Sequence, residues 1–531
     1  MLTPKSNIPD PQRRQLILGS GALLLAPWIQ TPAQTARRWQ GADPFCLGVA
    51  AGDPAPDGFV LWTRLAPEPL SGDRQSPGGM RGPSLTIGYE IASDEQMRSI
   101  VRSGTVAAEA LYAWSVHLEV TGLQAGRPYW YRFMSGDATS RIGRATTLPA
   151  PASPVQQLRL GYVSCANYEH GYFSAYRHLA SEQVDAVLFL GDYLYEYIDR
   201  RNPVVRRHSD GVAATTLPTY RNRHAQYKLD ADLQALHAST TALITWDDHE
   251  VQNNYAGGWS QDFSDPRKFM LRRAAAYQAF YEHMPVRPSR GLPDGPVLRV
   301  YDRYRFGELA EVSMIDGRQY RSAPACQTPE TVRNFRFETN ITCPERLLPE
   351  RSMLGAVQEK WLFDGLTSSK TRWNILAQDV QVAQNRKLLP DGASGFRSDS
   401  WDGYPAARKR LLQHLHDSKV NNPLVLTGDI HAWCTADLKL DFDEPRSPTV
   451  AREFVVSSIS ANGPARNPGR AFYADNPHML YYEGLRRGYA TVDLSGRSAT
   501  VRYRAVSDVS DPAATIETLK SFQVDGKAGP G

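Results

Sequence analysis

The chain has 531 residues and a hydrophobic fraction of 41%, which is enough apolar material for two or more packed domains and excludes a largely disordered protein. Its 60 basic and 56 acidic side chains give a formal charge of +4. This near balance excludes the strong positive field of a general nucleic-acid or membrane-surface binder, and we expect no nucleic-acid-binding module.

The first 36 residues have the layout of an export signal. Arg13 and Arg14 precede a short apolar stretch, residues 16–29, and small residues follow it up to Ala36. This order predicts a signal peptide over residues 1–36, and paired arginines followed by apolar residues indicate passage through the twin-arginine (Tat) translocon. The apolar stretch is too short to span a bilayer, so we expect a mature protein without a transmembrane anchor, periplasmic or extracellular. An ordinary N-terminal helix is the alternative.

Residues 45–149 have the pattern of a small all-β domain. Four short runs rich in β-branched and aromatic residues are separated by turn signals. These runs are residues 59–65, 85–91, 114–120 and 128–134. They predict a β-sandwich of the fibronectin or immunoglobulin type. The predicted loops carry no cluster of reactive side chains, so a packing and supporting domain is favoured over a substrate-binding module.

A proline-rich joint at residues 149–155 leads into a longer region, residues 155–507. Short apolar runs alternate there with longer helical patterns, which predicts an α/β or α+β sheet core with helices outside. The expected strands are residues 158–164, 184–190, 242–246, 373–377, 423–427 and 453–457, and the expected helices are residues 217–240, 268–283 and 357–367. Residues 508–531 are predicted to form a C-terminal tail or cap, loosely held and helical.

Polar side chains follow five of the predicted strands. The clusters are Cys165 with Asn167; Asp192 with Tyr195; Asp247, Asp248, His249 and Glu250; Gln378 with Asp379; and Asp429 with His431. Ligands of open sheets bind beyond the carboxyl ends of the strands. These carboxylates have no Lys or Arg among them and would repel one another unless a cation lay between them. Each cluster alone could be a turn or a helix N-cap, but together they predict a metal site.

The five cysteines leave at least one thiol unpaired. Cys326 and Cys343 lie 17 residues apart in a loop rich in proline and arginine, and they are the expected disulfide of an exported protein. Cys165, at a predicted strand end, needs a different explanation.

The order of the motifs resembles the alkaline phosphatase D (PhoD-like) family of metallophosphoesterases. The motifs are Cys165, "GDYLY" at 191–195, "WDDHE" at 246–250 and "GDIH" at 428–431. Four further blocks, at 45–67, 315–322, 398–408 and 476–489, are also similar to family blocks. The resemblance therefore covers essentially the whole mature chain. It implies a four-layer metallophosphoesterase β-sandwich flanked by helices, with an N-terminal fibronectin- or immunoglobulin-like β-sandwich domain.

The resemblance implies a ferric ion together with one or two calcium ions. In the general metallophosphoesterase pattern, Asp, Asn and His stand where this chain has Cys165, Asp248 and Asp429. Thiolate, phenolate and imidazole ligands suit ferric iron, whereas oxygen ligands alone suit calcium. The expected iron ligands are Cys165, Asp192, Tyr195 and His431. The expected calcium ligands are Asp192, Asp248 and Asp429, with Gln378, Asp379 and Asn167 competing for a further position.

His249 is the expected catalytic acid or electrostatic stabiliser at the leaving group; the alternative is that it orients Asp248. Asn167 is a second catalytic candidate. Arg318 and Arg321 are weaker candidates for binding substrate phosphate, since they could instead pair with Asp316. A basic loop at 199–207 could gather anionic substrate or could be a solvated surface.

The predicted function is hydrolysis of phosphodiesters, extending to phosphomonoesters, by attack of metal-activated water. A phospholipase D-type phosphodiesterase on the same scaffold is the nearest alternative. An exported metal-binding protein without catalytic activity is the other, although a set of ligands open to substrate argues against it, because structural metal sites are usually closed.

Overall fold

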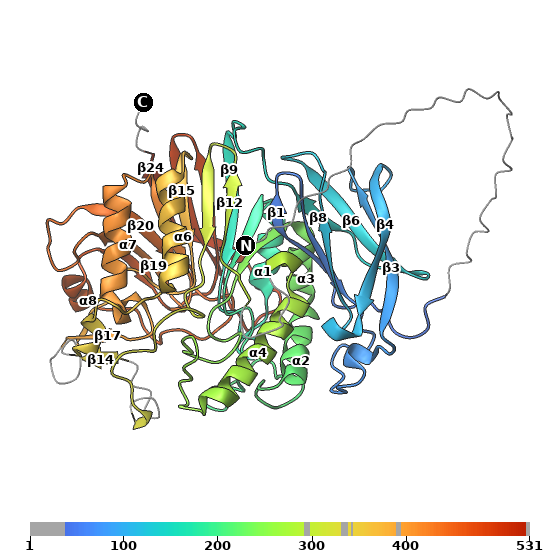
Figure 1. The fold of residues 1–531 in the computed structure, drawn as a ribbon. Helices are drawn as coiled ribbons and strands as arrows, with labels where there is room; N and C mark the ends of the chain where they lie inside the picture. The colour runs from blue at the N-terminus through green and yellow to red at the C-terminus, as the bar shows by residue number, and fades with distance from the viewer. Residues whose placement is uncertain (1–37, 291–297, 331–337, 341–342, 389–393, 527–531) are drawn as a thin grey trace, which may run out of the picture. The chain divides into compact units, whose positions relative to one another are not determined.

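The structure, a computed structural model, describes residues 38–290, 298–330, 338–340, 343–388 and 394–526 (Figure 1). The predicted signal peptide lies outside these residues, so its role stays a prediction. Within the described ranges, no helix combines the length and the apolar composition needed to cross a membrane.

Two large sheets form the centre of the fold. The nine-stranded sheet contains, in spatial order, β24 (Ile516–Asp525), β23 (Ser498–Val506), β22 (Gly488–Ser495), β9 (Gln157–Val163), β10 (Ala186–Leu190), β11 (Thr241–Thr245), β1 (Val49–Ala55), β2 (Gly58–Arg64) and β5 (Ser115–Val120). The seven-stranded sheet contains β12 (Asp302–Phe306), β13 (Ala310–Met314), β15 (Trp373–Ala377), β18 (Pro423–Thr427), β20 (Thr449–Val455), β19 (Trp433–Lys439) and β21 (Met479–Glu483). Leu188 and Phe454, one from each sheet, belong to one shared core, so the sheets pack face to face.

Helices cover the outer face of each large sheet (Figure 1). On the nine-stranded sheet they are α1 (Ser174–Ser181), α2 (Leu217–Lys228), α3 (Ala231–Ser239) and α4 (Pro266–His283). On the seven-stranded sheet they are α6 (Gly355–Ser368) and α7 (Pro405–Asp417). The order helix, sheet, sheet, helix confirms the predicted four-layer sandwich flanked by helices.

The predicted helix at 217–240 is two helices. Asp230 lies between α2 and α3, and its carboxylate accepts hydrogen bonds from the backbone N–H groups of Asp232 and Leu233. An aspartate in this position is a strong helix N-cap, so it starts a new helix instead of continuing the previous one.

The N-terminal region forms the predicted β-sandwich. Its second sheet contains β4 (Ile100–Glu109), β3 (Ser84–Ala92), β6 (Pro128–Ser135) and β7 (Ala138–Thr139), with β8 (Gly143–Thr146) pairing to β6. This sheet packs on β1, β2 and β5 around a shared core that includes Leu61 and Tyr131. The other sheet of the sandwich is not separate, because β1 pairs in parallel with β11 and joins the nine-stranded sheet. A domain division near residues 149–155 therefore stays a proposal.

The C-terminal segment differs from the prediction. A helix or loosely held cap was expected over 508–531, but the structure has the strand β24, antiparallel to β23 at the edge of the nine-stranded sheet. Leu519, Phe522 and Val524 pack against the core between the two large sheets. Their apolar contacts outweigh the glycines and alanines that favoured a loose tail.

Three further short strands and one short helix lie outside the large sheets. They are the sheet of β14 (Glu338–Asn340), β17 (Ser394–Arg397) and β16 (Lys387–Leu388), and the helix α8 (Arg470–Asp475).

Candidate metal centre

The predicted ligands lie at the carboxyl ends of parallel strands. β9, β10 and β11 are parallel neighbours in one sheet, and β15 and β18 in the other. Four predicted ligands that follow these strands have positive φ angles: Cys165 (61°), Asp192 (53°), Asp429 (67°) and His431 (52°). Residues other than glycine rarely adopt this conformation, and such strain concentrates at functional sites.

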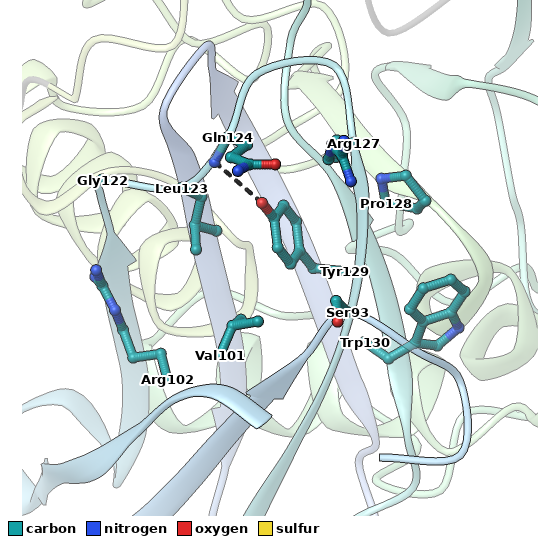
Figure 2. A pocket seen from close by; sticks show the side chains of 10 residues that line it. All are labelled: Ser93, Val101, Arg102, Gly122, Leu123, Gln124, Arg127, Pro128, Tyr129 and Trp130. Carbon is teal, nitrogen blue, oxygen red and sulfur yellow. Dashed lines mark hydrogen bonds between the residues drawn. The ribbon is translucent and has the colours of Figure 1, made fainter. Parts of the chain in front are cut away.

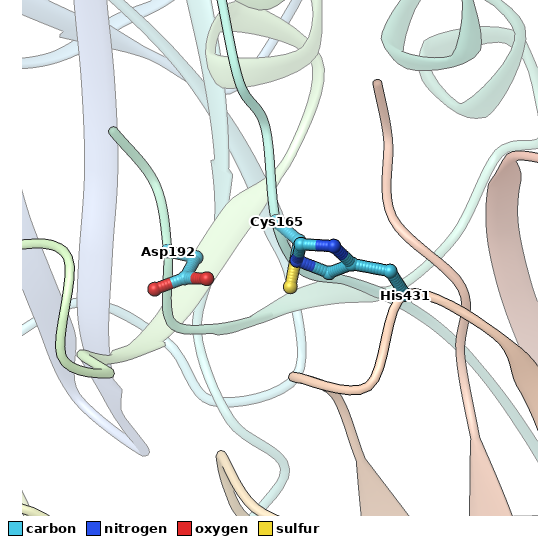
Figure 3. A group of neighbouring side chains, drawn as sticks. All are labelled: Cys165, Asp192 and His431. Carbon is cyan, nitrogen blue, oxygen red and sulfur yellow. The ribbon is translucent and has the colours of Figure 1, made fainter. Parts of the chain in front are cut away.

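One side of the centre combines sulfur, nitrogen and oxygen donors. Ligand atoms of Cys165, Asp192 and His431 lie within 4.8 Å of one another (Figure 3). The Tyr195 hydroxyl lies 2.8 Å from Asp192 Oδ2 and 2.9 Å from His431 Nε2. His431 Nδ1 lies 2.6 Å from the carbonyl oxygen of Asn462, which can only accept, so Nε2 carries the lone pair of the neutral ring. A single phenolic proton cannot serve both acceptors, whereas a cation among the four donors could.

The protonation states on this side follow from burial. Burial, and the neighbouring Asp192, raise the pKa of the Cys165 thiol well above its usual value. Burial and the positive charge of Arg487 lower the pKa of His431 to about 3. The imidazole is therefore neutral at pH 7, as a metal ligand must be, and the thiol would ionise only next to a cation.

The other side of the centre is rich in oxygen donors. Asp192, Asp248 and His249 form a second group whose ligand atoms lie within 4.8 Å of one another. Buried carboxylate oxygens of Asp247, Asp248 and Asp379 have no hydrogen-bond partner among the described residues. Burial and three nearby carboxylates raise the pKa of Asp192 well above its usual range. Buried oxygens that converge without accepting a hydrogen bond fit a hard divalent cation.

Arg318 lies inside the acidic cluster, fully buried. It binds Asp247 through Nε and Asp399 through Nη1. Its Nη2 has no hydrogen-bond partner and lies 3.6 Å from Asp248 Oδ2 and 3.5 Å from Asp429 Oδ1. The sequence offered Arg318 as a weak candidate for binding substrate, or as a partner of Asp316. In the structure its guanidinium group lies among the predicted ligands, where its positive charge offsets their negative charge. Asp316 accepts a hydrogen bond only from the backbone N–H of Arg318.

Arg321 is also enclosed. Its Nη1 and Nη2 donate to the carboxylate and carbonyl of Asp399 and to the carbonyl of Tyr255. With its side chain fully buried, Arg321 braces the loop that carries Asp399 and does not face the cavity expected for substrate.

His249 is held by a carboxylate that follows Tyr195. Its Nδ1 lies 2.7 Å from Glu196 Oε2, and its Nε2 lies 4.0 Å from Asp248 Oδ1. Burial opposes protonation, but the carboxylates of Asp248 and Glu196 outweigh it and raise the pKa of His249 to about 9. The imidazolium is thus the main form at pH 7 in the metal-free protein.

The three candidates for the further calcium position differ in their contacts. The Gln378 side-chain oxygen accepts a hydrogen bond from Trp401 Nε1, and its side-chain nitrogen donates to the carbonyl of Val380. Asn167 binds Tyr197 and the backbone of Glu169. Only Asp379, of these three, keeps a buried oxygen without a hydrogen-bond partner.

A cavity of about 850 Å³ reaches the centre, and Tyr195, His249 and His431 are among its lining residues. A second cavity of about 650 Å³ lies in the N-terminal sandwich, where Arg102, Leu123 and Tyr129 line it (Figure 2). None of the residues that line the second cavity is His, Cys, Asp or Glu. The strand ends are therefore the candidate reaction centre.

The cysteines are arranged as expected. Cys326 and Cys343 form a disulfide with a Cα–Cα distance of 6.3 Å, and Cys165 is free and buried.

Three contacts were not assigned from the sequence. Glu196 orients His249; Glu250 accepts hydrogen bonds from the backbone of Asp192, Tyr193 and Asp247; and Asp399 binds both buried arginines. Glu196 and Glu250 directly follow the "GDYLY" and "WDDH" residues, so position beside a ligand was the available signal. Asp399 lies 81 residues from Arg318 and 78 from Arg321, so its position in the sequence did not indicate these contacts.

Comparisons with known proteins agree over the length of the chain. The PhoD-like phosphatase family matches residues 160–503, and its N-terminal domain matches residues 31–149. Alkaline phosphatase D of Bacillus subtilis (strain 168) is 40% identical over 524 residues, which is 96% of this chain and 87% of that protein. A solved structure of PhoD superposes with a TM-score of 0.86 at 41% identity, covering 92% of each chain.

Proposed function

The chain belongs to the PhoD-like phosphatase family and is a phosphoric ester hydrolase, and on this basis we propose that it is an exported, metal-dependent enzyme that hydrolyses phosphodiesters and also phosphomonoesters. The observation that carries the proposal is the convergence of Cys165, Asp192 and His431 beside the Tyr195 hydroxyl, where Tyr195 and His431 line a cavity.

The donor chemistry supports two kinds of cation. Iron would be held by Cys165, Asp192, Tyr195 and His431, a set that combines thiolate, phenolate and imidazole. Calcium would be held by the carboxylates of Asp192, Asp248 and Asp429. Asp379 is favoured for the further position because its buried Oδ2 makes no hydrogen bond and lies 3.7 Å from Arg318 Nε. When bound, the cations would supply the positive charge that makes water nucleophilic and offsets the charge of the phosphoryl oxygens.

The protein's own residues supply orientation and a proton. Glu196 fixes His249 through Nδ1, which leaves Nε2 on the side of Asp248 and the cavity. In that position the imidazolium can donate its Nε2 proton to the departing alkoxide oxygen. Arg318 holds Asp247 and Asp399 and keeps a guanidinium group beside Asp248 and Asp429, which limits repulsion among the carboxylates before substrate binds.

The reaction class is tested with chromogenic esters. Hydrolysis of a bis(nitrophenyl) phosphate and, more slowly, of the mono-ester is expected from the purified protein. Release of choline from a phosphatidylcholine, with little activity on either chromogenic ester, would support the phospholipase D-type alternative. Binding of metal with no turnover of any ester would support the non-catalytic one.

The cations are tested on protein purified without added metal. Elemental analysis should find iron, and a phenolate on ferric iron should give a visible charge-transfer band that Tyr195→Phe abolishes. A calcium chelator should inactivate the enzyme while most iron stays bound, because an all-oxygen site holds its ion less tightly than one with thiolate. Full activity in iron-free protein, or in the presence of a strong calcium chelator, would contradict the assignment.

Export is tested in the producing cell. Replacing Arg13 and Arg14 with lysines should block passage through the Tat route and leave uncleaved precursor in the cytoplasm. Normal delivery of this variant to the periplasm or medium would refute the signal assigned to residues 1–36.

A further inference from the structure

We propose that His170 and Asp199 form a positioning pair that sets the orientation and the tautomer of His431 through Asn462, a role that rests on the metal-dependent function proposed above. Neither residue is a candidate ligand. Both are buried beside the candidate centre, with 5% and 6% of their side-chain surfaces exposed.

The chain of contacts begins at His431. Its Nδ1–H donates to the carbonyl oxygen of Asn462 at 2.6 Å, which directs Nε2 toward the Tyr195 hydroxyl. The orientation of this imidazole therefore depends on where the backbone of Asn462 lies. A histidine that binds metal through one nitrogen usually has its other nitrogen fixed in this way.

Asn462 is in turn held by His170. The backbone N–H of Asn462 donates to His170 Nδ1 at 3.1 Å, so Nδ1 carries no proton. His170 Nε2 must then bear the proton, and it donates to Asp199 Oδ2 at 2.7 Å. The contacts fix one tautomer of His170 and, through the same residue of the loop, the opposite tautomer of His431.

Asp199 is well suited to anchor this arrangement. One of its oxygens accepts the backbone N–H groups of Arg201 and Asn202 at 2.8 and 3.0 Å, and the other accepts the side-chain amide of Asn202 at 2.8 Å as well as His170. Its own N–H donates to the buried carboxylate of Glu169 at 2.6 Å. Burial opposes the charge of Asp199, but the hydrogen bonds that its carboxylate accepts from Asn202, Arg201 and His170 outweigh burial and lower its pKa, so it stays an acceptor-only carboxylate.

The segment that follows β10 thus supports the centre twice. Glu196 orients His249, and three residues later Asp199 orients His170. Tyr195, Glu196 and Asp199 all line the cavity, as do Arg200 and Asn202. The rim of the cavity and the ligand His431 therefore share one hydrogen-bond network.

The expected effect is on metal affinity. Without His170, the N–H of Asn462 loses its acceptor, and the carbonyl that holds His431 Nδ1 is no longer fixed. Loss of such an outer partner typically costs 10–100-fold in metal affinity. We expect iron to be lost to a chelator about 10–100-fold more readily from His170→Ala and Asp199→Asn than from the wild type.

Two further variants separate positioning from folding. His170→Asn can place an amide oxygen near the position of Nδ1 and so keep the acceptor for Asn462; it should recover part of the iron affinity. His178→Ala is the control, since it also removes an imidazole that binds the backbone: His178 Nε2 donates to the carbonyl of Ala514 at 2.7 Å, outside this network. It should keep the iron affinity of the wild type.

A second readout needs no metal. Long-range ¹H–¹⁵N spectra of metal-free protein labelled at histidine should show His431 protonated at Nδ1 and His170 at Nε2. In His170→Ala, the His431 signals should shift toward a mixture of tautomers, whereas His178→Ala should leave them unchanged.

The outcomes are distinguishable from failure of the proposed function. If the wild type binds no iron, that function fails, and the histidine spectra still decide the positioning role. Unchanged His431 signals in folded His170→Ala and His170→Asn, or wild-type iron affinity in both, would overturn the inference.

Discussion

Two buried clusters of opposite charge lie in this molecule, and they handle that charge differently. The acidic cluster at the strand ends contains Asp192, Asp247, Asp248 and Asp379, balanced in part by Arg318. The basic cluster, between β2 and the helices α2 and α4, contains Arg64, Lys228, His224 and His283. Glu282 opposes it, but its carboxylate already binds Arg221.

The basic cluster is closed by aromatic side chains. Lys228 Nζ lies 4.3 Å from the centre of the Trp62 ring and 3.4 Å from His237 Nε2, whose other neighbour is the Tyr193 hydroxyl. Burial lowers the pKa of Lys228 to about 7 and that of Arg64 to about 10. The lysine therefore gives up much of its charge near neutral pH.

The acidic cluster lies beside Tyr195 and His249, which line the cavity, and some of its oxygens make no hydrogen bond. Buried carboxylates that converge behind a cavity can retain their charge by taking up a cation, whereas a lysine enclosed by rings can only lose its proton. Excess buried charge therefore points to function where a counter-ion can reach it, and to a cost in stability where none can.

The largest expected effect comes from Cys165→Ala. Removing the thiolate should abolish iron binding and nearly all activity, while Cys165→Asp, which restores the ligand of the general pattern, should keep partial binding. Cys434→Ala is the matched control, because Cys434 is also a free, buried thiol but packs in the core under α7. Iron content and ester hydrolysis measure the effect. Ready alkylation of Cys165 in metal-loaded, active protein would show that Cys165 is not an iron ligand.

His249→Ala should lower the turnover number about 10²–10⁴-fold and leave iron bound, as expected for loss of a general acid. Glu196→Gln should give a smaller loss, since it keeps the imidazole but weakens the orientation of the ring and removes one of the carboxylates that raise the pKa of His249. Steady-state rates with esters of different leaving-group pKa measure the role, because an acid matters most for poor leaving groups. Equal losses for all leaving groups would mean that His249 only positions Asp248.

Lys228→Met tests the basic cluster. The folded-state pKa of about 7 lies below the unfolded value of about 10.4. Between these values the unfolded chain binds more protons, so stability should rise with pH from about 7 to about 10 by roughly 3–4 kcal/mol. Lys228→Met should be more stable at pH 7 and should flatten this rise. Urea unfolding across this pH range measures the free energy of unfolding, and Lys360→Met, at an exposed lysine, is the control. If Lys228→Met leaves the slope of stability against pH unchanged, the pKa of Lys228 is not lowered.

The smallest effect is expected outside both clusters. Cys326→Ala or Cys343→Ala should cost about 3 kcal/mol or less, since the disulfide closes a loop of 17 residues. Activity per folded molecule and iron content should not change. Thermal unfolding and a metal assay measure this; loss of iron on removing the disulfide would extend the centre to that loop.

The order of the strand-end motifs could be read from the sequence because it depends on short-range pattern. An apolar run followed by Asp192 or Asp429 predicts a buried strand and, just beyond it, polar side chains at the end of the sheet. Parallel strands then bring those ends together without further information. The disulfide was predicted from the spacing of Cys326 and Cys343, and the four-layer fold was implied by the family resemblance.

Other features depended on which distant segments meet. For Arg318 the sequence offered only Asp316 as a partner, because its sequence neighbours do not reveal Asp247 or Asp399, 71 and 81 residues away. Asn462 lies 292 residues from His170, so no local pattern could indicate their hydrogen bond. The sequence alone determined which donors the strands deliver; the packing of loops decided how each donor is oriented and neutralised, because hydrogen-bond partners and burial are properties of the folded chain.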